Sequence, residues 1–263
     1  NYFITSLLLD YSVEDTKVFH YAALDHWGNA FKPKKTQTKK VLLSQPVHKI
    51  QSQEKKTQVA FILTHAESLD ASQWPPHVAL AFYTPTPLMP TATEKGHECL
   101  IMVPFEPMSY PKDDPGYKTL LTGISDNKER LKSHLSHGKG IVGIVTFMGS
   151  RFMACRHEVT PIVRELKKQN LYFIDLKSTF RSVLMNVCKK ESASCAVATH
   201  ELDAIETTEA IDKAFDDLLK NNKHPRIGFA KATPYIVQKI KALKEKFHSS
   251  VEIVPLSAIL KVS

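Results

Sequence analysis

The chain has 263 residues, and 43% of them are hydrophobic, which is enough for one large core. Lys and Arg outnumber Asp and Glu by 35 to 27, and the resulting formal net charge of +8 raises the question of a nucleic-acid partner. Eight of these lysines lie between Lys32 and Lys56 beside one acid, Glu54, and no aromatic residues interleave with them. We therefore expect no nucleic-acid ligand.

Residues 1–56 show no sustained hydrophobic periodicity. The part from Lys32 onward is rich in Lys, Gln, Thr and Ser, which is typical of a solvated linker, with binding to envelope anions as the alternative. No apolar run approaches the ~18 residues of a membrane span. Because the first residue is Asn1 rather than Met, we expect a further segment upstream, for which a membrane anchor is one candidate. The sequence thus predicts an N-terminal extension and basic linker, residues 1–56, and one domain, residues 57–263.

The predicted domain contains eight short runs that are almost wholly apolar, with Glu252 in the last as the one charged residue. Unbroken apolar runs of strand length are typical of parallel strands that are covered on both faces. The runs are Val59–Leu63, Val78–Phe82, Leu100–Val103, Ile141–Val145, Leu171–Ile174, Cys195–Ala198, Ile227–Ala230 and Val251–Val254.

Amphipathic helical patterns, with apolar residues three and four apart, alternate with the later runs. They lie in Val159–Leu166, Ile211–Leu219 and Ile236–Phe247. Asn170 predicts a left-handed helix end, Pro234 a helix start, and Asp126 with Glu129 a capping box before a further helix. Prolines predict short helices after the first two runs. The alternation indicates an α/β fold, and seven or eight strands favour a distorted β/α barrel over a dinucleotide-binding sheet, since GxGxxG and GxxxxGK[ST] are absent.

Polar residues follow most of the apolar runs. In such folds the functional site lies at the carboxyl ends of the strands, so these residues are expected to converge on one mouth. The predicted catalytic residues are Glu106 and Asp175, and the predicted binding residues are His65, Ser150, Arg151, Lys177, Arg181, Asp203 and Lys231.

Several of these residues also have a purely structural interpretation, which the sequence leaves open. His65 could be a capping or hydrogen-bonded histidine, and Glu106 could brace a loop by accepting backbone N–H bonds. Asp175 could cap the next element or pair with Arg181, and Lys231 could be solvated.

The cysteines do not suggest a structural metal site. Four are present, and none forms a CxxC pair of the spacing usual for zinc. Cys188 and Cys195 are close enough in sequence to form a disulfide if the compartment is oxidising. The cysteine pattern alone does not decide the compartment.

Several motifs occur together in a specific order. They are Pro104–Pro107 (PFEP), Tyr110–Gly116 (YPKDDPG), Thr119–Leu121, Gly143–Phe152 (GIVTFMGSRF), Phe173–Asp175 with Ser178 and Arg181–Ser182, and Ile253–Ala258 (IVPLSA). By these motifs the segment from Val59 to Lys261 resembles the divergent polysaccharide deacetylases, a family of bacterial envelope proteins.

The resemblance implies a distorted barrel of the glycoside hydrolase/deacetylase type. It also implies a metal-dependent carbohydrate esterase, in which Asp and His hold a divalent metal, usually zinc. That metal polarises the acetamide carbonyl and activates water. The implied substrate is an N-acetylated envelope glycan, and the implied location is the periplasm or cell envelope of a Gram-negative bacterium.

The chain departs from the family pattern at the places of the metal ligands. Where active-looking members end their first strand in Asp-Asp, this chain has Thr64 and His65. Phe147 replaces a His after the fourth strand, and Ala230-Lys231 replaces a Gly-His pair after the seventh. Phe cannot bind a metal, Thr binds it poorly and a lysine ammonium repels it.

We therefore expect no metal cofactor of the family type, and whether the chain is an enzyme stays open. The alternative is a new metal site with His65, Glu106 and Asp175 as its ligands, which would favour manganese or magnesium over zinc. The sequence predicts a deacetylase-like protein of envelope-glycan metabolism with a degenerate metal site, with a non-catalytic module that binds glycan or protein as the second hypothesis.

Overall fold

The computed structural model describes residues 56–83, 86–109, 119–136, 140–220, 225–246 and 250–260. All the described residues belong to one compact unit, Ser52–Ser263. Apart from Lys56, the predicted extension and linker lie outside the described residues, as does the motif Tyr110–Gly116. The domain boundary at residue 57 therefore stays a prediction.

The described residues form a sheet in which every strand pairing is parallel. Its order is β6-β5-β4-β3-β2-β1-β8-β7, and β9 pairs with the first residues of β1. The strands are β1 Thr57–Thr64, β2 Ala79–Phe82, β3 Glu98–Phe105, β4 Ile141–Met148, β5 Tyr172–Asp175, β6 Cys195–Val197, β7 His200–Glu201, β8 Ile227–Lys231 and β9 Val251–Ile253.

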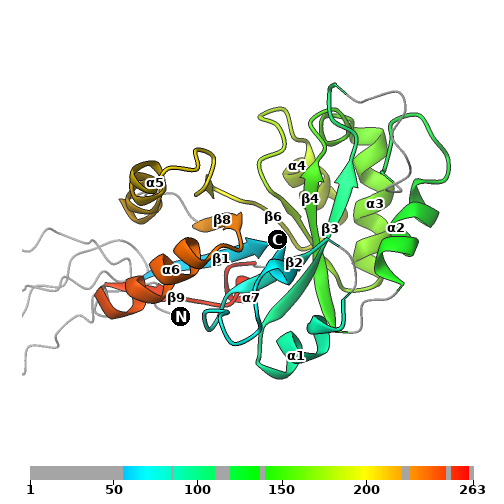
Figure 1. The fold of residues 1–263 in the computed structure, drawn as a ribbon. Helices are drawn as coiled ribbons and strands as arrows, with labels where there is room; N and C mark the ends of the chain where they lie inside the picture. Colours follow the sequence, from blue (N-terminus) through cyan, green and yellow to red (C-terminus); the bar gives the residue numbers. More distant parts are fainter. Residues whose placement is uncertain are drawn as a thin grey trace, which may run out of the picture. The chain divides into compact units, whose positions relative to one another are not determined.

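The eight strands of the main order curl into a half-barrel (Figure 1), which confirms the predicted distorted β/α barrel. Within the part of the chain that is described, β6 and β7 at the two ends of the order do not pair with each other, so the barrel is open there. All eight predicted runs are strands. The two-residue β7 was not predicted.

The apolar runs have no polar alternation because both faces of the sheet are buried. Along β1, Phe61 and Leu63 pack in the cluster under the helices, whereas Ala60 and Ile62 pack in the cluster inside the half-barrel. Small residues from several strands and Leu256 and Leu260 from the end of the chain fill the inner cluster. A strand with two apolar faces is typical of a parallel sheet covered by helices.

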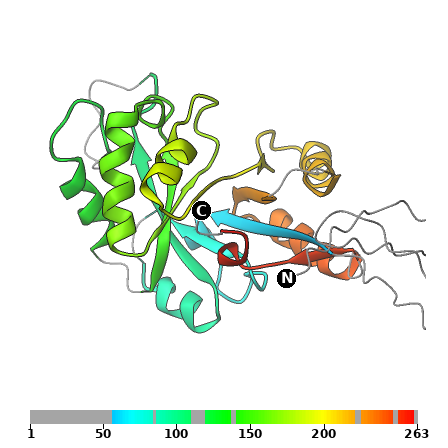
Figure 2. The same cartoon turned by 180° about the vertical axis from the view of Figure 1, so that it is seen from behind.

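The helices form separate groups around the sheet. In both ribbon views α2, α3 and α4 lie together, away from α5 and α6 (Figures 1 and 2). The helices are α1 Leu88–Glu94, α2 Asn127–Leu135, α3 Arg156–Lys168, α4 Leu184–Glu191, α5 Thr208–Lys220, α6 Pro234–Lys246 and α7 Leu256–Ile259, with short 3-10 turns at Ala66–Ser68 and Phe152–Ala154. No helix in the described part of the chain is long and apolar enough to cross a membrane.

Most of the predicted helix signals are confirmed. Asn170 is left-handed with φ 54°, Pro234 is the first residue of α6, and the element after β1 is only a 3-10 turn. The capping box is wrong, because the Asp126 side chain makes no cap hydrogen bond and instead pairs with Arg130 Nε at 3.1 Å. The helices α4 and α7 were not predicted.

A disulfide joins α4 to β6. Cys188 and Cys195 are bonded, with their Cα atoms 6.2 Å apart, while Cys99 and Cys155 are free. The sequence had left this pairing open. The bond closes the short turn between the end of α4 and the start of β6.

Candidate functional site

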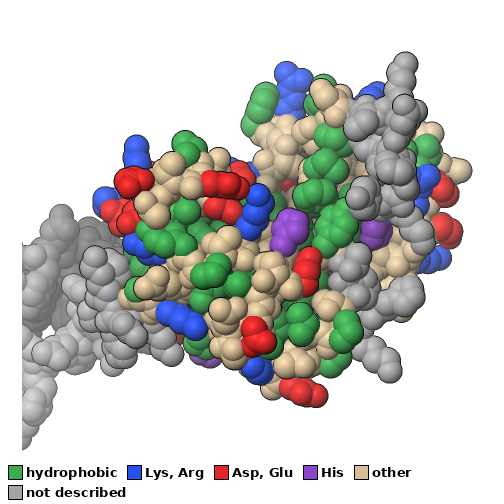
Figure 3. Space-filling model, viewed as in Figure 1, with side chains coloured by type: hydrophobic (Ala, Val, Ile, Leu, Met, Phe, Trp, Pro, Cys, Tyr) green, Lys and Arg blue, Asp and Glu red, His purple; other side chains and the backbone are tan. Residues whose placement is uncertain are grey.

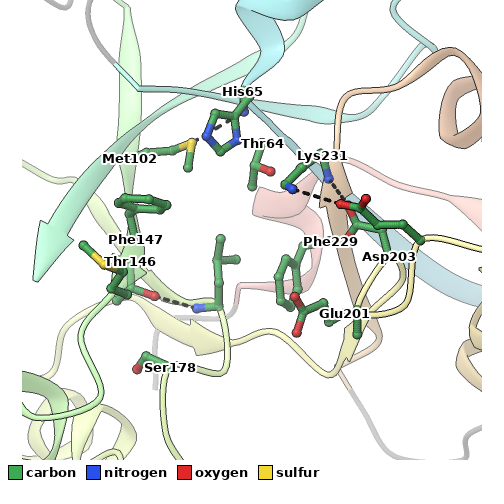
Figure 4. A pocket seen from close by; sticks show the side chains of 14 residues that line it. Thr64, His65, Met102, Thr146, Phe147, Ser178, Glu201, Asp203, Phe229 and Lys231 are labelled. Carbon is green, nitrogen blue, oxygen red and sulfur yellow. Dashed lines mark hydrogen bonds and ion pairs between the residues drawn. The ribbon is translucent and has the colours of Figure 1, made fainter. Parts of the chain in front are cut away.

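A pocket of about 440 Å³ opens at the carboxyl ends of the strands. Its lining residues come from the ends of β1, β4 and β8, from Met102 in β3, from β7, and from the segments that follow β5 and β7. Figure 4 shows two walls that face each other, an apolar one with Phe147 and Met102 and a charged one with Lys231 and Asp203. The same contrast is visible on the surface, where hydrophobic and charged side chains gather on different sides of a hollow (Figure 3).

Aromatic rings shape the first wall. The His65 ring stacks on Tyr83 with ring centroids 6.3 Å apart, and Phe147 meets both rings edge-on, at 6.2 Å from His65 and 5.4 Å from Tyr83. His65 takes this place because its backbone is left-handed, with φ 52°, where β1 turns into the 3-10 helix. Its Nδ1 atom is buried without a hydrogen-bond partner. The wall thus presents ring surface, which suits an apolar ligand face.

Charged groups form the opposite wall. Asp203 accepts a hydrogen bond from the backbone N–H of Lys231 at 2.8 Å, and Glu206 Oε1 lies 3.2 Å from the Lys231 ammonium. Because the side chains of Lys231 and Glu206 are 59% and 77% exposed, this ion pair stabilises the fold only slightly. Glu201 also lines the pocket from β7. This wall can therefore bind polar or charged groups of a ligand.

Asp175 lies buried behind the pocket, at 0% exposure. Its Oδ1 accepts hydrogen bonds from the Thr146 hydroxyl at 3.2 Å and from the backbone N–H of Ser178 at 2.9 Å, and both of these residues line the pocket. Its Oδ2 has no partner. Asp175 therefore caps the turn after β5, one of the alternatives that the sequence left open, and ties two residues of the pocket wall together.

Glu106 belongs to a different group of contacts, outside the pocket lining. Its Oε2 accepts hydrogen bonds from the backbone N–H and the hydroxyl of Thr122, at 2.6 and 2.7 Å, and its Oε1 lies 3.2 Å from Arg151 Nη1. Its backbone carbonyl accepts hydrogen bonds from the N–H groups of Arg151 and Phe152. Glu106 thus braces the loops beyond β3 and β4, as one of its two interpretations expected.

The other predicted residues lie around the mouth without lining the pocket. The Ser150 hydroxyl accepts a hydrogen bond from the Met108 N–H at 2.9 Å. Lys177 is exposed and left-handed, with φ 57°, and the Arg181 guanidinium lies 5.3 Å from the centroid of the Phe180 ring. Of the predicted set, the pocket brings together His65, Asp203 and Lys231.

Several lining residues escaped the sequence reasoning. Glu201 belongs to the two-residue β7, which has no apolar run to reveal it. Phe229 and Met102 lie inside apolar runs, where nothing in the sequence separates the inner face from the outer one. Glu206 follows Asp203 in the same segment. Its ion pair with Lys231 identifies it as a residue of the site, and that pair can be seen only in the folded structure.

The pocket does not fit the metal that the family resemblance implies. All four residues at the assigned ligand places, Thr64, His65, Phe147 and Lys231, line it. The Thr64 hydroxyl, which donates to the Ala230 carbonyl at 3.2 Å, is a poor metal ligand, and the Lys231 ammonium, which faces Glu206, has no electron pair to offer a cation. No group of three or more His, Cys, Asp or Glu side chains that could hold a metal occurs among the described residues. The alternative set of His65, Glu106 and Asp175 is therefore not assembled.

Comparison with known proteins gives both a family and a fold. The family model described as divergent polysaccharide deacetylase matches residues 63–260. A crystal structure of an uncharacterized protein from Agrobacterium tumefaciens C58 is 28% identical with a TM-score of 0.69, over 78% of this chain and 90% of that one. The chitin deacetylase of the fungal pathogen Colletotrichum lindemuthianum aligns at 8% identity with a TM-score of 0.36, over 80% of this chain and 89% of that one. No curated protein matches the chain.

Proposed function

The chain belongs to the divergent polysaccharide deacetylase family, and from this premise we propose that it binds an amino-sugar polysaccharide of the cell envelope without the family's metal-dependent hydrolysis. It is in this sense a pseudoenzyme. The ligand lies in the pocket at the carboxyl ends of β1, β4, β7 and β8.

The composition of the pocket at the assigned metal-ligand places carries this proposal. Thr64, His65, Phe147 and Lys231 come from three separate strand ends and meet in one pocket, so the place for a ligand is kept while the metal-binding groups are replaced. A catalytic zinc site needs three protein ligands and an open position. With a phenyl ring and a paired ammonium among the four, such a site is not available.

The same residues suit a sugar ring. One face of a pyranose carries C–H groups, which pack on an aromatic ring such as that of Phe147, while its hydroxyl groups need hydrogen-bond partners. Thr64 and the carboxylates of Glu201 and Asp203 offer such partners across the pocket. An apolar wall opposite a few polar groups is typical of small-molecule sites.

We further propose that the protein works in the periplasm or envelope of a Gram-negative bacterium. The disulfide between Cys188 and Cys195 supports this location, because such bonds persist in oxidising compartments. Thiol counting on denatured protein from its own compartment tests the proposal: two free thiols are expected, and four would contradict it.

The test of the function combines acetate release with metal content. The purified chain is incubated with chitooligosaccharides and with peptidoglycan fragments, with and without added zinc, and metal is measured after dialysis. We expect no acetate above the protein-free background and less than one tenth of an equivalent of metal. Acetate release that chelation abolishes, metal restores and His65→Ala removes would overturn the proposal.

A further inference from the structure

The pocket is acidic although the chain is basic. Among the lining residues, Glu201, Asp203 and Glu206 are acidic and only Lys231 is basic, which gives three negative charges against one positive charge and a net charge of −2. The chain as a whole carries +8. A cationic ligand is therefore favoured at the pocket.

The carboxylates of this wall are not all used by the fold. Glu206 pairs with the Lys231 ammonium, and Asp203 uses Oδ2 to accept the Lys231 backbone N–H. Within the described part of the chain, Glu201 makes no side-chain hydrogen bond or ion pair and is exposed at the pocket. Glu201 and the second oxygen of Asp203 can therefore accept hydrogen bonds from a ligand.

The facing wall also favours a positive charge. Phe147 lies across the pocket from Asp203 (Figure 4), and the face of an aromatic ring attracts a nearby cation. Behind this side of the pocket lies the fully buried carboxyl of Asp175, whose Oδ1 is bonded to Thr146 and Ser178 of the wall and whose Oδ2 has no partner. The acidic groups thus lie on more than one side of the pocket. Lys177, a base outside the lining, is exposed between the lining residues Leu176 and Ser178.

We propose that the pocket selects amino sugars whose amino group is free, so that the protein recognises deacetylated stretches of a glycan rather than acetylated ones. This inference rests on the proposed function. A free amino group is an ammonium with three N–H donors, whereas an acetamide is neutral and has one. Hydrogen bonds between an ammonium and a carboxylate are about twice as strong as neutral ones. The pocket therefore fits the product of a deacetylase better than its substrate.

Calorimetric titration of the full chain with two oligomers of equal length tests this inference. One oligomer is the fully N-acetylated chitotetraose, and the other is the fully deacetylated tetramer, at a pH where its amines are protonated. We expect the deacetylated tetramer to bind at least about tenfold more tightly, which corresponds to one gained charge-assisted hydrogen bond. Glu201→Gln should remove most of this preference, while Glu209→Gln, an equal charge change at an exposed position of α5 outside the pocket, should keep it.

The possible outcomes distinguish a failure of this inference from a failure of the proposed glycan binding. Equal binding of the two tetramers, or tighter binding of the acetylated one, would overturn the selection of free amines and leave glycan binding intact. A preference that survives in both Glu201→Gln and Asp203→Asn would overturn the assignment to the acidic wall. If neither tetramer binds, the proposed function itself fails.

Discussion

Two groups of polar side chains at the carboxyl ends of the strands differ in where their hydrogen bonds go. The Glu106 group, beyond β3 and β4, is closed on itself, because Glu106 is bonded to Thr122 and Arg151 through both of its oxygens. The group around the pocket is open, because Glu201 and one oxygen of Asp203 face the pocket. Both groups lie where an α/β fold places its functional residues.

This difference shows that position at a strand end does not by itself identify a ligand-binding residue. Parallel strands bring all their carboxyl ends to one edge, and the loops at that edge also need polar groups to satisfy their backbone. A carboxylate whose oxygens are occupied by loop N–H groups holds the site in shape. A carboxylate that faces the pocket can bind a ligand.

The largest expected effect on stability comes from replacing Glu106, which removes the hydrogen bonds of the closed group. Glu106 is 7% exposed, and Glu106→Ala leaves the half-buried Thr122 N–H without its acceptor and removes the ion pair with Arg151, so we expect the free energy of unfolding to fall by about 3 kcal/mol. Urea unfolding of wild type and variant measures this change in the free energy of unfolding. Glycan binding should persist in the folded fraction. The matched control, Glu129→Ala, removes an exposed carboxylate that pairs with Lys132 and should change stability by less than about 0.5 kcal/mol.

If Glu106→Ala kept the wild-type stability and lost glycan binding, Glu106 would belong to the binding site, and the comparison of the two groups would fail.

A smaller effect on stability is expected from Asp175. Like Glu106 it accepts hydrogen bonds from a loop, but the two residues that it binds line the pocket. Asp175→Ala removes the acceptor for Thr146 and Ser178, so we expect a loss of about 2 kcal/mol in the free energy of unfolding. Because both of these residues line the pocket, glycan binding should weaken as well. Unfolding and titration on the same preparation measure both effects. A variant with wild-type stability and wild-type affinity would show that Asp175 has neither role.

The smallest effect is a pH dependence of stability. His97 is buried, its Nδ1 lies 3.0 Å from the Val78 carbonyl oxygen, and burial is the main reason why its pKa is lowered from the ordinary value of 6.5. The unfolded chain therefore takes up the proton more readily than the folded one. The free energy of unfolding should fall as the pH decreases through 6.5 and level off below the lowered pKa of the folded chain.

Unfolding curves of wild type and His97→Gln between about pH 7 and pH 5 measure this contribution, because this pH interval covers the ordinary pKa of histidine. The decline should be shallower in the variant. It should not vanish, because burial also lowers the pKa of His200. Equal slopes in the two proteins would contradict a neutral, buried His97.

The sequence predicted the longer strands well because they are apolar on both faces, so that an unbroken apolar run marks each of them. It predicted the short elements poorly. The strand β7 has two residues, too few for any periodicity, and α4 carries its apolar residues over only two turns. Among site residues, His65 and Lys231 were found because they directly follow or end a long apolar run. Glu201 was missed because the strand that carries it is itself invisible in the sequence.

Strand ends can be read from one sequence, but hydrogen-bond partners cannot. Glu106 and Asp203 look alike as acidic residues after an apolar run, and only the fold shows that Thr122 occupies one oxygen of Glu106 while one oxygen of Asp203 stays available. The bracing and binding roles of these carboxylates are decided by loops distant in sequence.

The central claim, that this pocket binds glycan without a metal, is tested most directly by titrating the full chain with chitooligosaccharide in the presence of EDTA. We expect the affinity to be the same in EDTA and in zinc. It should fall about tenfold in Phe147→Ala, return in Phe147→Tyr, and stay unchanged in Met185→Ala, which alters an exposed side chain of α4 outside the pocket. Binding that EDTA abolishes and zinc restores, or binding that is indifferent to Phe147→Ala, would contradict the account.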